Sequence, residues 1–383
     1  MNELLLEKPH EEDESGRELM KINMGPNHPS THGVLRFIVH TDGEIMHKAV
    51  PEVGYLHRGL EKIAEGLPYA SFMPYTDRIN YMEAMFCNQV YAMAVEDLAD
   101  IEVPPRAEYL RVITTELNRL ANHHVTLGAM AMDVGALTPF VYLLRERESI
   151  NDLMEALCGN RLTYNYMRIG GVSADVDEAW LKALETFLDH FEPIINELDR
   201  LISGNEILIK RFVEVAPICA ADAVAYGLVG PNLRASGVDW DLRRDQPYSV
   251  YEDFDFEIPT GEHPRAIEGD CYRRWVVRVD EMRQSCRILR QAMAKLPEGD
   301  ILGKVPRKIK PPAGETYVAV EGARGELGVY LVSDGSPKPY RLKWRSSSFA
   351  ALSIFEHVTP GLMIADLVAL IASLDTIAPE MDR

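Results

Sequence analysis

Three short segments combine residue types that can move protons or hold a polar ligand. Residues 23–33, Asn-Met-Gly-Pro-Asn-His-Pro-Ser-Thr-His-Gly, form a loop of turn-forming residues that contains His28 and His32. Tyr81 follows Asp-Arg-Ile-Asn in a segment with helical, otherwise apolar spacing, and Asp133 stands among small and apolar residues that should be buried. Phenol, imidazole and carboxylate groups form hydrogen bonds to a ligand and act as general acids or bases.

The same residues also fit purely structural roles. Tyr81 can pack in the core with one hydrogen bond, and Asp133 can cap a helix or pair locally, because most buried polar groups are structural. His28 and His32 have the spacing of two metal ligands on a helix, but the glycines and prolines around them disfavour a helix there. The residue types alone leave both interpretations open.

The composition limits the classes of protein and of site. The chain has 383 residues, of which 46% are hydrophobic, enough to bury a large core. Its 40 basic and 59 acidic residues give a net charge of −19, so we expect no nucleic-acid partner. The five cysteines are scattered without a Cys-x-x-Cys pair, which argues against a zinc site, a redox pair or a disulfide framework. The apolar stretch 361–373 is shorter than the about 20 residues that cross a bilayer, so we expect a soluble chain.

The spacing of apolar residues and of turn formers predicts the elements that must position these side chains. Extended runs on both sides of Asp42-Gly43 predict a β-hairpin. His123 and His124 are neighbours on a predicted helix, so we expect at most one of them in the core. The predicted strands are 34–40, 44–50, 316–320, 326–332 and 339–344. The predicted helices are 74–98, one that starts at Pro104-Pro105 and continues at least to His124, with Gly135 ending it or the loop after it, 138–158 with Thr138 as cap, 176–203, 271–296 and a closing helix at 359–373. Residues 227–269 should be irregular.

This pattern predicts an α+β fold, in which a central helical bundle is flanked by small antiparallel sheets from the N- and C-terminal regions. The expected division is an acidic tail at 1–18, a β-rich domain at 19–66 that contains the histidine loop, a helical bundle at 67–300, and C-terminal strands with the closing helix at 301–383.

Longer blocks, in collinear order, resemble a known family. They are GPNHPSTHGVLR (25–36), GYLHRGLEKIAE (54–65), PPRAEYLRVITTELNRLANH (104–123), DVGALTPFVYLLRERESI (133–150), NYMRIGGV (165–172), LRASGVDWDLR (233–243) and GELGVYLVSDG (325–335). Together they resemble the quinone-site D subunit of the proton-pumping NADH:quinone oxidoreductases (respiratory complex I), which is related to the large subunit of nickel-iron hydrogenases. The resemblance implies a hydrogenase-large-subunit-like fold. Asn27, where glutamine is more usual, departs from the family pattern.

The resemblance also implies roles for four residues. His32 and Tyr81 would face the quinone head group, Asp133 would pair with His32, and Gly33 would let the flat ring approach closely. The implied catalytic residues are therefore Tyr81, His32 and Asp133, and the implied quinone-binding residues are His32, Gly33 and Tyr81. Reduction of a quinone consumes two electrons and two protons, and a phenol and an imidazole can each donate a hydrogen bond to a quinone carbonyl.

The resemblance further implies what the chain works with. Quinone is the substrate, the chain itself holds no metal or flavin, and the electrons come from an iron–sulfur cluster of a neighbouring subunit. The implied partners are the other peripheral-arm subunits and the membrane-arm subunits. The enzyme would be an NADH:quinone oxidoreductase that is active only when assembled, translocates protons, and lies peripherally on the cytoplasmic side of the cell membrane.

Three alternatives stay open or are disfavoured by the residues. A true hydrogenase requires two Cys-x-x-Cys pairs, which the sequence lacks. The chain can instead be a non-catalytic scaffold of such a complex. The electron donor can also be ferredoxin or a deazaflavin in place of NADH, because related complexes share this subunit and nothing in the chain recognises the donor.

Overall fold

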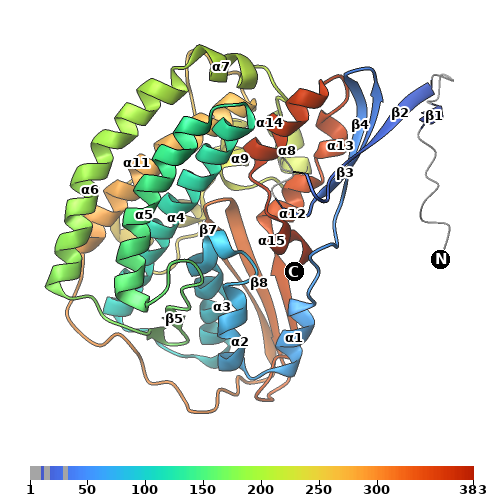
Figure 1. Cartoon of the computed structure of the whole chain (residues 1–383). Coiled ribbons are helices and arrows are strands. Elements are labelled where there is room, and N and C mark those ends of the chain that lie inside the picture. The colour runs from blue at the N-terminus through green and yellow to red at the C-terminus, as the bar shows by residue number, and fades with distance from the viewer. Residues whose placement is uncertain (1–9, 13–17, 29–32) are drawn as a thin grey trace.

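The computed structural model describes residues 10–12, 18–28 and 33–383. Figure 1 shows long helices that run side by side, a narrow sheet that extends from one end of them, and a second sheet next to α2 and α3. The predicted α+β arrangement of a helical bundle flanked by small antiparallel sheets is confirmed.

The N-terminal sheet has four antiparallel strands in the order β1-β2-β3-β4. Their bounds are His10–Glu12, Glu18–Met24, Arg36–Asp42 and Ile45–Glu52. In β3 the side chains of Phe37 and Val39 are buried while their neighbours are partly exposed, as expected for a strand with one covered face. The hairpin predicted around Asp42-Gly43 is confirmed.

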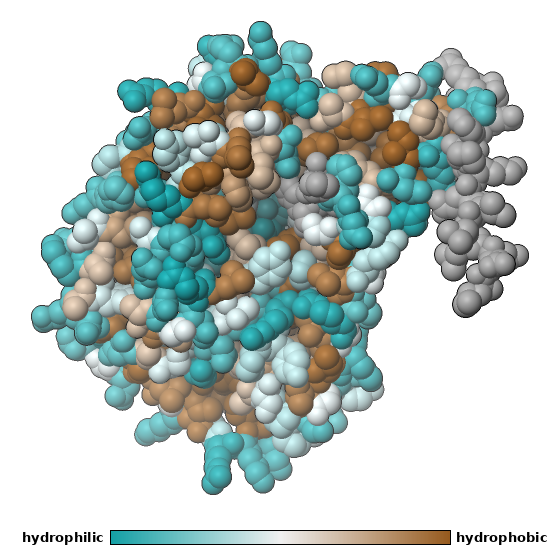
Figure 2. All heavy atoms as spheres, viewed as in Figure 1, coloured by the Kyte–Doolittle hydropathy of each residue, from teal (hydrophilic) through white to brown (hydrophobic). Residues whose placement is uncertain are grey.

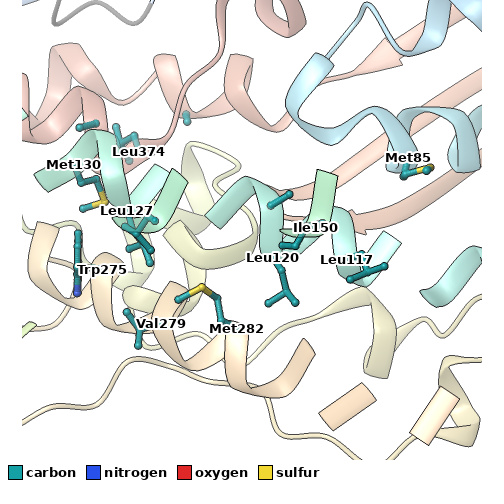
Figure 3. Close-up of a cluster of buried hydrophobic side chains, with 14 of the residues drawn as sticks. Met85, Leu117, Leu120, Leu127, Met130, Ile150, Trp275, Val279, Met282 and Leu374 are labelled. Atoms are coloured by element: carbon teal, nitrogen blue, oxygen red, sulfur yellow. The ribbon is translucent and has the colours of Figure 1, made fainter. Parts of the chain in front are cut away.

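The bundle is built around α4 (Pro105–Asp133), and most of its residues are buried. Figure 3 shows Leu127 and Met130 of α4 next to Trp275 and Val279 of α11, with Leu374 of α14 close by. Each such side chain contributes about 1.5–3 kcal/mol through burial. The other helices of this region are α1 (Leu60–Gly66), α2 (Tyr69–Thr76), α3 (Ala84–Ala99), α5 (Leu137–Cys158), α6 (Glu178–Leu198), α7 (Glu206–Phe212) and α11 (Cys271–Lys295), with a π-helical turn η3 at Asp199–Ser203.

Because α4 is surrounded on all sides, His123 and His124 are both fully buried, and the expectation that at most one lies in the core is wrong. His123 Nε2 lies 2.8 Å from Glu281 Oε2, while His124 Nδ1 lies 2.5 Å from the carbonyl oxygen of Leu120. Opposite sides of this helix both face protein.

Two predicted helices begin elsewhere. The helix expected at 74–98 is divided into α2, a 3₁₀ turn η2 (Tyr81–Glu83) and α3, because the Asn80 side chain accepts hydrogen bonds from the next backbone N–H groups and starts a new helical segment. α5 begins at Leu137, so Thr138 is not its cap. Pro139 then lies in the first turn, where its missing N–H leaves no hydrogen bond unmade.

The C-terminal region forms a three-stranded antiparallel sheet and four helices. The sheet, β7-β8-β9, packs against α3. The expected closing helix is observed as α14, and three further short helices accompany it. Short helices also interrupt residues 227–269, the segment predicted to be irregular. The bounds are β7 Gly314–Gly322, β8 Gly325–Ser333, β9 Arg341–Arg345, α12 Ser347–Leu352, α13 Phe355–Val358, α14 Ile364–Leu374 and α15 Ala378–Asp382; the remaining short elements are β5 Met167–Arg168, β6 Gly171–Val172, α8 Ala220–Ala225, α9 Gly230–Ala235, α10 Leu242–Asp245 and η4 Tyr251–Asp253.

One hydrophobic core contains Phe37 of the N-terminal sheet, Leu117 of the bundle and Leu374 of α14. A second core joins α2 and α3 to the C-terminal sheet. The domain boundaries near 66 and 300 therefore stay a prediction.

Candidate functional site

Tyr81 is the first residue of the 3₁₀ turn η2 and stands at the surface of the chain. The Oδ1 atom of Asn80 accepts hydrogen bonds from the N–H groups of Met82 (3.1 Å) and Glu83 (3.2 Å), which fixes the start of the turn. Tyr81 is 37% exposed, and its hydroxyl forms no hydrogen bond with the residues that the structure describes. The alternative that Tyr81 is a core residue is therefore wrong, and its phenol is accessible to a ligand.

Two buried carboxylates lie behind this turn. The amide nitrogen of Asn80 donates a hydrogen bond to Glu83 Oε2 and another to Glu380 Oε2, each at 2.7 Å. Ser346 and Ser348 also donate to Glu380, at 2.6 and 3.1 Å. Burial raises the pKa of Glu83 to about 7, although Arg324 acts in the opposite direction. Asn80 is therefore held by a network that is closed to solvent.

Arg324, in the turn between β7 and β8, continues the network toward α4. Its backbone N–H donates to Glu83 Oε1 at 2.7 Å, and its guanidinium pairs with Asp375 at 3.0 Å. The hydroxyl of Thr126 on α4 donates to Asp375 Oδ2 at 2.9 Å. The Tyr81 turn is thus bonded to the C-terminal region, which is bonded to the central helix.

The short helix α15 lies between this turn and Gly33. A Cβ added at Gly33 would lie 3.7 Å from the Cβ of Ala378, and the Gly33 backbone has a φ of +126° that favours glycine. The Asp382 carboxylate fixes α15 by accepting hydrogen bonds from the N–H groups of Gly54 (2.8 Å) and Leu56 (2.6 Å). Helix α15 therefore lies next to Gly33 through Ala378 and is hydrogen-bonded to the Tyr81 turn through Glu380.

Asp133 is the last residue of α4 and is half-buried, less than its apolar sequence context predicts. Asn118 on the same helix donates to the carbonyl oxygen of Met82, at 2.9 Å. Fifteen residues separate Asn118 from Asp133, about 22 Å along an α-helix. The structure therefore does not bring Asp133 into contact with the Tyr81 turn. His32 lies outside the described residues, so its pairing with Asp133 stays a prediction.

Sequence reasoning missed the buried residues that hold the Tyr81 turn. Asn80 and Glu83 have the spacing of a capping box, in which a polar residue is followed three positions later by Glu, and this signal predicts a helix start between Asp77 and Ala84. No local signal marks Glu380, because its partner Asn80 is 300 positions away.

Comparison with known proteins decides the family. The family model described as respiratory-chain NADH dehydrogenase, 49 Kd subunit, matches residues 133–308 and 302–383. The NADH-quinone oxidoreductase D 2 subunit of Sorangium cellulosum is 56% identical over 97% of both chains. The D 1 subunit of the same enzyme from Anaeromyxobacter sp. (strain K) is 55% identical over the full length of both chains, and the D subunit from Clostridium beijerinckii is 50% identical over 96% of this chain and 98% of its own. The chain belongs to this family.

Membership confirms the predicted resemblance, the hydrogenase-large-subunit-like fold, and the expectation of a subunit of an oxidoreductase complex. In the described part of the chain, no helix combines the length and the apolar character that crossing a membrane requires. The described residues also contain no group of three or more His, Cys, Asp or Glu side chains arranged to hold a metal ion. Among the predicted site residues whose side chains the structure describes, Tyr81 has the most exposed polar side chain.

Proposed function

We propose that this chain is the quinone-binding subunit of a complex I-type NADH:quinone oxidoreductase. Tyr81 and His32 hold the quinone head group, Asp133 tunes His32, and Gly33 lets the ring approach. The observation that carries the proposal is the exposed phenol of Tyr81 on a turn that buried hydrogen bonds hold from behind. A ligand-binding group is most effective when its support is rigid before the ligand arrives.

The residue chemistry suits quinone reduction. The quinone oxygens gain negative charge as electrons arrive, so a hydrogen bond from the Tyr81 hydroxyl becomes stronger during the reaction. An adjacent carboxylate favours the protonated form of an imidazole, which makes His32 a proton source beside Asp133. Phenol and imidazole together supply hydrogen bonds to both ends of the head group.

The electrons come from an iron–sulfur cluster of a neighbouring subunit. The open side of Tyr81 supports a shared site, because a bound quinone ring needs a second wall to bury its other face. Other peripheral-arm subunits and the membrane arm complete the assembly, which couples quinone reduction to proton translocation on the cytoplasmic side of the membrane. NADH is the donor in this proposal, and assays of the purified complex with NADH or reduced ferredoxin distinguish the donors.

Tyr81→Phe in the assembled complex tests the role of the phenol, because it removes only the hydroxyl. We expect quinone reductase turnover to fall at least tenfold, which corresponds to about 1.4 kcal/mol, while NADH oxidation with a water-soluble artificial acceptor stays unchanged. Tyr340→Phe is the matched control, since Tyr340 is 68% exposed on the C-terminal sheet side of the chain. Near-normal turnover of Tyr81→Phe with unchanged quinone affinity contradicts the assigned role.

A photoreactive quinone tests the site against the scaffold alternative. We expect labelling of residues next to Tyr81, and competition by quinone-site inhibitors. A chain that only supports the complex would remain unlabelled under the same illumination.

A further inference from the structure

A large groove lies beside the start of α2, the helix that precedes the Tyr81 turn. The connection from α11 to β7 runs as coil past β5 and α2 (Figure 1), and between them lies a hollow of about 920 Å³. Its walls include apolar side chains such as Met73, Ile169, Val305 and Pro306. Figure 2 shows hydrophobic surface between hydrophilic side chains along this lower edge of the molecule.

The groove is basic although the chain as a whole is strongly acidic. Residues 304–314, Lys-Val-Pro-Arg-Lys-Ile-Lys-Pro-Pro-Ala-Gly, carry four positive charges and no acid, whereas the whole chain carries −19. The side chains of Arg307, Lys308 and Lys310 line the groove together with Arg168, and no acidic residue is among the described residues that line it. Arg307, Lys308 and Lys310 are exposed and form no ion pair with the described part of the chain.

Arg307, Lys308 and Lys310, which lack a carboxylate partner among the described residues, differ in this from Arg161, an exposed arginine elsewhere on the surface. Arg161 pairs with three carboxylates, those of Glu148, Asp152 and Glu155. Unpaired like charges within seven residues repel one another, so an arrangement that leaves them together favours an anionic neighbour.

The backbone of the connection is open as well. Gly303 donates a hydrogen bond to the carbonyl oxygen of Gly170 at 2.8 Å, and the Ile301 carbonyl accepts one from Val172 at 3.0 Å. From Lys304 to Lys310, by contrast, no backbone hydrogen bond joins the coil to the described residues. Backbone groups that leave water need partners, and an extended segment of another chain supplies N–H and C=O groups at matching intervals.

We propose that this groove binds an extended, acidic segment of a neighbouring subunit of the complex. Apolar side chains of the segment fill the hollow, and its carboxylates pair with Arg307, Lys308 and Lys310. A partner protein fits better than a nucleic acid or an anionic membrane, because the net charge of −19 repels dense phosphate at long range while the apolar walls suit side chains. The inference rests on the proposed assembly with other subunits, and it does not depend on the quinone site.

Zero-length carbodiimide cross-linking of the purified complex tests the proposal, because the reagent joins a lysine amine only to a carboxylate in contact with it. We expect cross-links from Lys304, Lys308 or Lys310 to Asp or Glu residues that are close together in one neighbouring subunit. Cross-links within this chain alone overturn the proposal. So does protection of these lysines from acetylation without any cross-link, which indicates a phosphate-bearing lipid instead.

Charge reversal provides an independent measurement. The triple variant Arg307→Glu, Lys308→Glu, Lys310→Glu is expected to reduce co-purification of the cross-linked subunit at least tenfold. The control variant Lys182→Glu, Arg200→Glu, Lys210→Glu alters the net charge by the same amount, but at exposed residues of α6, η3 and α7. It should leave co-purification unchanged. Full assembly of the first variant overturns the proposal.

The Tyr81→Phe complex separates this inference from the quinone site. It should show the same cross-links as the unmodified complex, whatever its turnover. Loss of turnover therefore tests the proposed function, and loss of cross-links or of the neighbouring subunit tests the groove.

Discussion

The protein contains two clusters of polar side chains, which differ in whether every side chain has a partner in the described part of the chain. In the centre of the bundle, ionisable residues that are at most 1% exposed pair with one another. At the Tyr81 turn, buried residues form a closed network, but the phenol that extends from it is exposed and has no partner among the described residues. The central network consists of Glu116, Arg119, His123, Arg234, Asp241, Arg243, Glu281 and Glu321.

Two carboxylates of the central network are held in the charged form, whereas burial raises the pKa of a third, Glu321, to about 7. Burial alone would raise the pKa of Glu281, but Arg234 and His123 lower it below its usual range. Glu116 is likewise held below its usual pKa, because Arg119 and Arg243 outweigh the effect of burial. The comparison separates buried polar groups that satisfy one another from a phenol that stays open to solvent on a hydrogen-bonded support.

Removal of one central cation should give the largest effect. Arg234 pairs with Glu281, Asp241 and Glu321, so Arg234→Ala leaves three carboxylates in the core without it. We expect a loss of about 3–5 kcal/mol, enough to prevent accumulation of the subunit. The amount of this chain in the purified complex measures the effect.

The exposed Arg161 is the matched control, since it too pairs with three carboxylates. Arg161→Ala should cost less than about 1 kcal/mol, because water screens exposed ion pairs. Equal losses in the two variants would contradict the distinction between buried and exposed networks.

Asp133→Asn should have the next largest effect, and on activity rather than on assembly. Without the anion, the pKa of the neighbouring imidazole falls, so the protonated form persists only at lower pH. We expect quinone reductase turnover near neutral pH to fall about tenfold and the optimum to shift to lower pH. The pH profile of turnover measures this, with Asp152→Asn on exposed α5 surface as control. A lower rate with an unshifted profile would show that Asp133 is only structural.

Glu83→Gln should give the smallest effect. The folded-state pKa of about 7 exceeds the ordinary value of 4.5, so the proton bound by Glu83 stabilises the folded turn fully below pH about 4.5 and this contribution disappears as the pH rises through about 7. Relative to the variant, the unmodified turn should lose about 1 kcal/mol between pH 6 and pH 8. Amide hydrogen exchange of residues 80–84 in the complex measures this difference. Glu197→Gln on exposed α6 surface should leave the exchange unchanged, and a pH-independent difference for Glu83→Gln would refute the raised pKa.

Local chemistry determines those parts of the fold that could be predicted from the sequence. The hairpin at Gly43, the helix that begins at Pro105 and the C-terminal strands follow from turn residues and periodicity, and the structure confirms them. The break before Tyr81 was missed, because the apolar spacing continues across it while the Asn80 side chain interrupts the backbone. His123 and His124 are both buried because other elements surround α4 on all sides, and the spacing of apolar residues along the sequence does not indicate this.

The candidate site shows the same limit. Residue types and the resemblance selected Tyr81, and the structure shows that its side chain is exposed. The support from Glu380 and Arg324 comes from contacts between segments 241 to 300 positions apart, which no local pattern reveals. Asp133 was expected to be buried because its neighbours are apolar, but a helix end lets its side chain reach solvent.

The contact of α15 with the Tyr81 turn has a consequence for synthesis of the protein. Asn80 leaves the ribosome long before Glu380, and at 5–20 residues per second the 300 positions between them correspond to a delay of about 15–60 s. During that interval the turn lacks its C-terminal partner, so the hydrogen-bonded support of Tyr81 is complete only after residues 378–382 have been translated. A neighbouring subunit that recognises the supported Tyr81 turn would therefore bind only chains that have been translated through residue 382.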